Sequence, residues 1–134
     1  MQVNTKIATL HGIFLEKPAQ MVIIPAFDGE VGILPSHIPC VFKLESGLIK
    51  LYDTQSVAKE KIFIFGGFAK ISGDQLDIVT DKAIHLEDID IKATNEKIKL
   101  LEAQLLSSED EIFLRSVQTD LNLHRKMLEA VSAR

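Results

Sequence analysis

The sequence predicts an all-β N-terminal domain, a sandwich or a barrel, followed by a C-terminal antiparallel two-helix hairpin. From Val3 to about Leu86, apolar residues alternate or come in short runs separated by turn residues, as is typical of such β-domains. Beyond this stretch, apolar residues recur every three or four positions, which is the spacing of amphipathic helices. The predicted domains are therefore residues 1–87 and 88–134.

Composition narrows the possible functions. With 134 residues, the chain holds one domain, or a small domain with an appendage. Its net charge of −4 argues against nucleic acid as the main partner, because phosphate binding needs a concentrated positive surface. Cys40 is the only cysteine, so no internal disulfide forms, which fits a reducing compartment. No signal peptide or membrane-spanning run is visible, so we expect any membrane association to be indirect.

The strands are predicted from runs rich in Val, Ile and Phe. The clearest candidates lie at residues 20–26, 48–52, 61–65, 68–71 and 75–79. The pair Gly66 and Gly67 interrupts one such run and predicts a bulge or a corner. A phosphate loop is the weaker interpretation of this pair, because neither a GxGxxG nor a Walker spacing occurs in the chain.

The C-terminal hairpin is predicted from two apolar stripes and two helix-start signals. Acidic residues at 87, 88 and 90 suit the positive end of a helix dipole, and Ser108 with Glu111 forms a capping box for the second helix. A hairpin this small rarely buries enough surface to be stable alone, so we expect it to dock on the β-domain, on a partner, or on each in turn. The expected stripes are Ile91, Thr94, Ile98, Leu101 and Leu105, then Leu114, Val117, Leu121, His124, Leu128 and Val131.

Residues 26–39 form the least ordinary stretch of the chain. Asp28 and Gly29 between apolar residues predict a hairpin turn, because both tolerate positive φ. Pro35 and Pro39 predict a rigid, non-helical loop that carries His37. This stretch is either a turn with a strand connection or a contact surface, and the pattern alone leaves both open.

Catalytic and metal-binding signals are weak. The four histidines, His11, His37, His85 and His124, show no metal-ligand spacing, and the lone cysteine lies in no nucleophile motif. Asp88 and Asp90 fit the start of a helix better than a general acid/base pair. A small β-sandwich enzyme using His37 and a carboxylate is therefore the weaker hypothesis.

Three stretches resemble a known family. Residues 29–39, read as Gly-acid-x-Gly-aliphatic-Leu-Pro-x-His-x-Pro, resemble the signature of the epsilon subunit of F-type ATP synthases. Residues 66–71 are similar to the family's Gly-Gly strand, and residues 76–83 to the strand that closes its β-domain. The resemblance implies a sandwich of about ten strands, no bound cofactor, and a non-catalytic central-stalk subunit that couples rotation to the catalytic head.

The resemblance also implies partners. The family's β-domain is held against the gamma subunit and rests on the ring of c subunits, so the chain would lie peripherally on the cytoplasmic side of the inner membrane of a bacterium. Carried over by position, the contact residues for the c-ring and gamma are Glu30, Val31, Gly32, His37 and Pro39.

In the family the hairpin is also a regulator. In bacterial members it either lies folded against the β-domain or extends along gamma toward the catalytic beta subunits. In the extended form, basic residues of the second helix meet an acidic loop of the beta subunit and ATP hydrolysis slows. The matching residues here are Arg115, Arg125 and Lys126, with Arg134 as a further candidate. Because residues 110–134 hold as many acids as bases, we expect only modest inhibition.

Some members of the family bind ATP at the base of the hairpin through an aliphatic-Asp-x-x-Arg-Ala pattern. Ile89 and Asp90 keep the first two positions, but Ala93 occupies the arginine position, so we expect no tight ATP binding. The main alternative to the stalk subunit is a helical-hairpin chaperone or adaptor with a β-domain.

Overall fold

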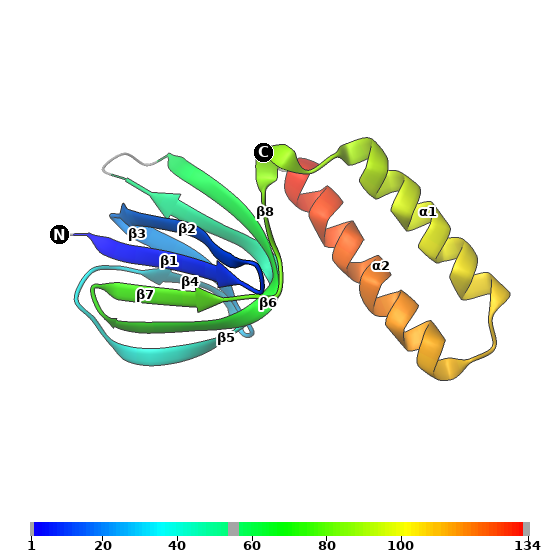
Figure 1. Ribbon diagram of the computed structural model, residues 1–134, viewed down its shortest axis with the longest axis horizontal. Helices are drawn as coiled ribbons and strands as arrows, with labels where there is room; N and C mark the ends of the chain where they lie inside the picture. The colour runs from blue at the N-terminus through cyan, green and yellow to red at the C-terminus, as the bar shows by residue number, and fades with distance from the viewer. Residues whose placement is uncertain (1, 54–56, 133–134) are drawn as a thin grey trace. The chain divides into compact units, whose positions relative to one another are not determined.

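The computed structural model describes residues 2–53 and 57–132. The chain divides into two compact units, residues 1–85 and 86–134, which are a β-sandwich unit and a helical unit (Figure 1). No helix in these described ranges is long and apolar enough to cross a membrane. The observed division places the last strand in the first unit and the whole helical hairpin in the second.

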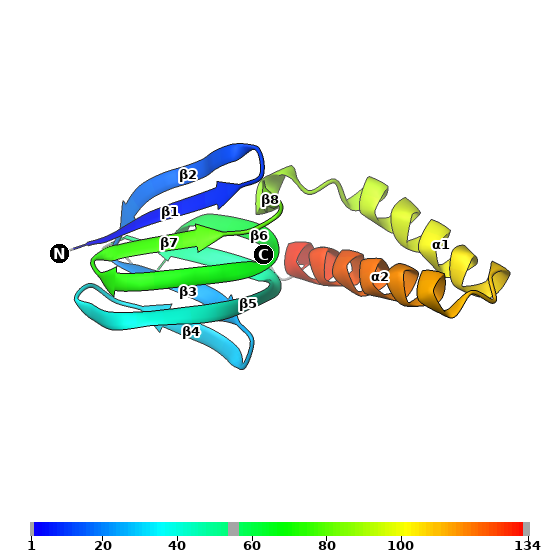
Figure 2. The same ribbon diagram turned by 60° about the horizontal axis from the view of Figure 1, so that its bottom comes forward.

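The described residues of the first unit form eight strands that wrap into a sandwich (Figure 2). Their order in the sheet is β2-β1-β7-β6-β5-β3-β4, and β8 pairs with β6. All neighbours are antiparallel except β1 and β7, which are parallel. The strands are β1 Val3–Thr9, β2 Gly12–Ala19, β3 Met21–Ala26, β4 Gly29–Ile33, β5 His37–Tyr52, β6 Ala58–Gly73, β7 Gln75–Val79 and β8 Ala83–His85.

Two strands are unusually long because they run through both halves of the sandwich. β5 and β6 each span 16 residues and pair with each other along most of that length. β6 pairs with β8 through Ile62–Ile64 and with β7 through Phe68–Ser72. The predicted fold class is confirmed, and the expectation of about ten strands corresponds to eight elements because β5 and β6 each supply two stretches.

The corner between the two stretches of β6 lies at the predicted glycine pair. Gly66 and Gly67 have φ angles of 83° and 128°, a region that residues with a Cβ rarely adopt. A Cβ on Gly67 would lie 2.0 Å from the carbonyl oxygen of Val79. The absence of a side chain therefore lets the chain that leaves β7 cross directly over β6.

The core of the β-unit is filled by inward-facing side chains from all eight described strands, with Ala19 and the partly buried Phe14 and Leu15 from β2 and the partly buried Ala83 from β8. Such alternation of inward and outward residues is what the period of a strand imposes. The main buried aliphatic residues are Val3, Ile7, Val22, Ile24, Ile33, Leu44, Ile49, Leu51, Ile62, Ile64, Ile71, Leu76 and Ile78.

The helical unit has a short 3₁₀ turn, η1 Leu86–Asp88, followed by α1 Ile91–Ser107 and α2 Glu111–Ser132. Its core is a cluster of Ile98, Leu101, Val117 and Leu121, with Leu105 and Leu128 packed against it. The predicted stripes are therefore correct in their centres. At the ends they differ, because Ile91 is exposed while Met127, which the stripe omitted, is buried.

Both helices begin with an aspartate cap. Asp90 caps α1, its carboxylate accepting a hydrogen bond of 3.1 Å from the amide of Ala93. Asp110 caps α2 and accepts from the amides of Ile112 and Phe113 at 3.0 and 3.3 Å. The predicted capping box of Ser108 and Glu111 is wrong, because the Ser108 hydroxyl accepts instead from the amide of Asp110.

The glycine corner gives a direct test of the fold. We expect Gly67→Ala to lower the free energy of unfolding by more than about 3 kcal/mol, because the new Cβ meets backbone and the φ angle is strained. Gly12→Ala is the matched control and should cost about 1–2 kcal/mol, since Gly12 has a φ of 111° but no other group lies within 4 Å of the position a Cβ would take. Urea unfolding measures both, and equal losses would contradict the close approach.

Candidate partner-binding site

The stretch of residues 29–39 is more ordered than the sequence predicted. The hairpin between β3 and β4 turns at Phe27 and Asp28, one residue earlier than expected, and Gly29 already pairs with Ala26. The loop expected to carry His37 is also shorter, because the turn ends at Ser36 and β5 begins at His37. The segment is therefore a strand, a tight turn and the start of a second strand.

The tight turn is fixed by Asp74, which lies in the β6–β7 connection. Ser36 has a φ of 61° and its amide donates a 2.7 Å hydrogen bond to Oδ1 of Asp74. The backbone carbonyl of Asp74 accepts a second 2.7 Å bond, from the amide of Asn4. One residue thus joins the β4–β5 turn to the start of β1, which restricts the motion of this end of the sandwich.

His37 and Pro39 lie next to this turn. The Nδ1 atom of His37 is 2.7 Å from the carbonyl oxygen of Ile38, and its ring lies edge-on to Phe42 at a centroid distance of 6.5 Å. The β5–β6 pairing is irregular between His37 and Cys40, where β5 has one residue more than β6. Pro39 falls in this irregularity, as expected for a residue without an N–H in a strand.

Three large apolar side chains near the turn are exposed. Leu34 precedes Pro35 in the turn, and Ile38 and Val41 lie in the first part of β5. The exposed fraction of Ile38 is 75%. We call these three residues the turn patch. Several exposed large apolar side chains within a few residues of one turn are typical of protein–protein contact sites.

Glu30 and Gly32 lie on one face of β4, and Val31 lies on the other, because side chains alternate along a strand. The carboxylate of Glu30 is 3.8 Å from Nζ of Lys50, and Glu30 itself is mostly exposed. A Cβ on Gly32 would meet only Sδ of Met21, at 3.6 Å. Val31 packs against the core, so it supports the strand rather than a surface.

The structure does not bring all the predicted contact residues together. Glu30 lies near the β3–β4 hairpin at the beginning of β4, whereas His37 lies beyond the end of β4 at the Asp74-bound turn. The two residues therefore lie near opposite ends of β4, Glu30 within β4 and His37 at the start of β5.

A second exposed apolar surface was not predicted from the sequence. Ile13 pairs with Ala8, Ala8 with Val79, and Val79 with Phe68, so these side chains form a row across β2, β1, β7 and β6. Ile13, Val79 and Phe68 are all exposed. The row is hidden in the sequence because its members come from four strands, and only the cross-strand register places them side by side.

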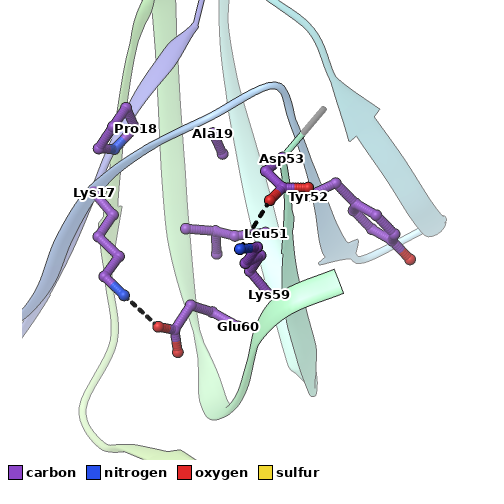
Figure 3. Close-up of a pocket in the computed structure, with 8 residues that line it drawn as sticks. All are labelled: Lys17, Pro18, Ala19, Leu51, Tyr52, Asp53, Lys59 and Glu60. Carbon is purple, nitrogen blue, oxygen red and sulfur yellow. Dashed lines mark hydrogen bonds and ion pairs between the residues drawn. The ribbon is translucent and has the colours of Figure 1, made fainter. Parts of the chain in front are cut away.

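A pocket of about 140 Å³ lies between the end of β2 and the adjoining ends of β5 and β6 (Figure 3). Its charged groups are paired with one another: Lys17 with Glu60, and Lys59 with Asp53 at 3.2 Å. Glu60 also lies 3.7 Å from Nδ1 of His85. Among the described residues, no group of three or more His, Cys, Asp or Glu side chains could hold a metal ion.

The basic residues predicted to contact the catalytic beta subunit lie along α2. Arg125 lies 3.4 Å from the carboxylate of Glu102 on α1, and Arg115 is exposed. Lys126 is also exposed, and it makes a non-covalent contact within the protein. Arg134 lies outside the described residues.

The two residues that matched the family's ATP pattern have structural roles. Ile89 is buried, and Asp90 caps α1 with both its carboxylate and its backbone carbonyl, which accepts from Thr94. These roles account for both residues within the helical unit.

The chain combines a β-sandwich that has exposed apolar surfaces with a helical hairpin. These features are those of a protein subunit that binds other proteins. The model of the ATP synthase delta/epsilon chain β-sandwich domain matches residues 2–86. Since this match covers well over half of the chain, the protein belongs to the ATP synthase delta/epsilon chain family.

Related proteins match this chain over most of its length. The ATP synthase epsilon chain of Granulibacter bethesdensis is 28% identical over 131 residues, which is 96% of each protein. That of Rickettsia bellii is 31% identical over 104 residues, covering 77% of this chain and 96% of the relative. The predicted epsilon-type, non-catalytic subunit is thus confirmed, and the chaperone or adaptor alternative is set aside. As an ATP synthase subunit, the chain is part of a membrane-associated complex.

Solved structures show the same fold. A chain in the Euglena gracilis mitochondrial ATP synthase structure of OSCP, F1 and the c-ring has a TM-score of 0.84 at 23% identity, covering 97% of this chain and 81% of that chain. A chain from the central stalk and c-ring of the Tetrahymena thermophila enzyme has a TM-score of 0.69 at 12% identity, covering 98% and 97%.

The role of Asp74 can be tested by removing its carboxylate. Asp74→Ala should lower the free energy of unfolding by about 1–2 kcal/mol, because the amide of Ser36 loses its acceptor. Asp74→Asn keeps an oxygen at the same position and should lose less than half as much. Thermal unfolding of the two variants beside the wild type measures the difference, and an equal loss for both would contradict the role of the hydrogen bond.

Proposed function

We propose that the β-sandwich docks on the rotor of the ATP synthase through the turn patch and the adjoining strand β4. The observation that carries this proposal is the combination of exposed Leu34, Ile38 and Val41 with a turn that Asp74 holds in place. Apolar side chains on a rigid turn bind at low entropic cost, because little conformational freedom is lost on association. The partners are the gamma subunit and the c-ring, which the family resemblance implies.

The separation of Glu30 from His37 supports two contacts rather than one. His37 and Pro39 adjoin the turn patch and would contact gamma. Glu30 lies at the other end of β4, and it would face the polar loops of the c-ring together with Gly32, which is on the same face of the strand. A rigid strand between the two contacts suits a subunit of a rotary motor, because bending between them would dissipate torque.

The proposal places the chain on the cytoplasmic side of a bacterial inner membrane. The rotor holds it there. The proposed function includes no ATP-binding site at the base of the hairpin. The carboxylate of Asp90 caps α1, and the side chain of Ala93 has no charge that could bind a phosphate.

The hairpin would be a modest inhibitor of ATP hydrolysis. The side chain of Arg125 already faces Glu102 within the hairpin, so its charge is partly neutralised before any contact with a catalytic beta subunit. Exposed ion pairs of this kind contribute little individually. Inhibition would therefore depend mainly on the hairpin occupying space near the catalytic subunits, with Arg115 and Lys126 adding a smaller electrostatic contribution.

The gamma contact can be tested by making the turn patch polar. Ile38→Ser should weaken binding of the full chain to the gamma subunit by about tenfold or more, because a largely exposed apolar anchor is lost. Val57→Ser is the matched control, since Val57 is similarly exposed but lies before β6 and outside the turn patch. Calorimetric titration against gamma measures both affinities, and an unchanged affinity for Ile38→Ser would refute the contact.

The c-ring contact can be separated from the Glu30–Lys50 pair by a charge swap. Glu30→Lys should reduce proton-coupled ATP synthesis in the assembled complex. Combining it with Lys50→Glu restores the pair on the sandwich but not a negative charge at residue 30. We therefore expect the double variant to stay impaired. Recovery of full synthesis in the double variant would show that Glu30 acts only through Lys50.

The regulatory role of the hairpin predicts an effect of truncation. Ending the chain after residue 87 should raise ATP hydrolysis by the complex by about twofold to threefold, because the inhibition is expected to be modest and corresponds to less than about 1 kcal/mol. The β-sandwich unit remains intact in this variant, so binding to gamma should be unchanged. Hydrolysis assays on purified complexes measure the effect. An unchanged rate of ATP hydrolysis would show that the hairpin is not an inhibitor.

A further inference from the structure

The tip of the helical hairpin carries the most exposed large apolar side chains of the described residues. Leu106, in the last turn of α1, is 91% exposed, and Ile112, in the first turn of α2, is 81% exposed. Phe113 follows and is also exposed. Figure 1 shows that the end of α1 and the start of α2 meet at one end of the hairpin.

Packing between the two helices does not explain these residues. The seam of the hairpin is formed by Ile98, Leu101, Val117 and Leu121 with Leu105 against them. Leu106 follows Leu105 by one position, which turns it about 100° around the helix and away from the seam. Helix propensity does not explain Ile112 either, because a β-branched residue is a poor choice for an exposed helical position.

Three consecutive acids lie beside the exposed apolar residues. Asp110 uses its carboxylate to cap α2, but Glu109 and Glu111 are exposed and form no ion pair within the described ranges. Arg115 is the only basic residue between positions 106 and 115. The tip is therefore both apolar and negatively charged, unlike the mixed charge of the rest of α2.

We propose that this hairpin tip, defined by Leu106, Glu109, Asp110, Glu111, Ile112 and Phe113, docks into an apolar pocket rimmed by Lys or Arg on another subunit of the ATP synthase. Charge complementarity selects this occupant. Exposed apolar side chains need a dry pocket, and the flanking carboxylates need cations at its rim.

The same charges argue against two other occupants. Two copies of the chain joined tip to tip would place the acids of one copy against those of the other. A membrane surface with anionic lipids would repel the tip for the same reason. The contact is also distinct from the proposed contact of α2 with the catalytic beta subunit, because there the basic residues of this chain would meet acids.

The experiment uses the full chain assembled into the ATP synthase, with a photoreactive benzophenone amino acid in place of Ile112. We expect illumination to crosslink the tip to one site on another subunit, next to Lys or Arg residues. Glu109→Gln together with Glu111→Gln should reduce the yield several-fold, and so should raising the salt concentration, because both weaken a charged rim contact.

Two controls match these changes. The same probe at Ile91, which is 44% exposed at the opposite end of α1 from the tip, should not reach that site. Glu96→Gln with Glu129→Gln removes two exposed acids elsewhere on the hairpin and should leave the yield unchanged. Thermal unfolding of each variant checks that the hairpin remains folded.

The proposal is overturned if the probe at Ile112 forms no crosslink to another subunit, or crosslinks only to lipid or to a second copy of the chain. It is also overturned if the crosslinking yield is unchanged when Glu109 and Glu111 are replaced by glutamine. Failure of the proposed rotor contact would look different. In that case Ile38→Ser would bind gamma as tightly as the wild type, whatever the crosslinking yield of the probe at Ile112.

Discussion

The β-unit depends on one close approach of two backbone segments, where the chain leaving β7 crosses over Gly67. Beyond the crossing, the amide of Phe65 donates to the carbonyl of Lys82, and the chain continues as β8 along the first stretch of β6. On the other side of the corner, the amide of Thr80 donates to Ala8 of β1. A side chain at Gly67 would separate these segments, so one glycine allows β6 to serve both halves of the sandwich.

Local sequence signals predicted much of this architecture because their causes are local. The glycine pair predicted a corner. The change from short apolar runs to apolar residues every three or four positions predicted where the helical hairpin begins. The choice of cap was less predictable, because Ser108 and Asp110 are both good capping residues. The helix starts where the carboxylate of Asp110 accepts from two amides, and a sequence pattern cannot show which of two candidates, two positions apart, achieves that geometry.

The candidate site was predictable only in part, because its properties depend on contacts distant in sequence. The motif at residues 29–39 marked the right segment, but its rigidity comes from Asp74, 38 residues beyond Ser36. The motif also grouped Val31 with Glu30 and Gly32, although strand alternation turns Val31 into the core. The apolar row of Ile13, Val79 and Phe68 needed the register of four strands and had no signal in the sequence.

The arrangement of charge in the helical unit favours two separate contacts over a single basic arm. Arg125 is engaged with Glu102 between the helices, which ties part of the positive charge of α2 to the closed hairpin. Opening the hairpin would release that charge and expose the seam around Leu121 at the same time. In the packed hairpin, Arg115 and Lys126 of α2 stay exposed, as does the acidic, apolar tip. The same hairpin thus carries two exposed surfaces of opposite charge, an acidic tip and a basic part of α2, and each suits a partner of different charge.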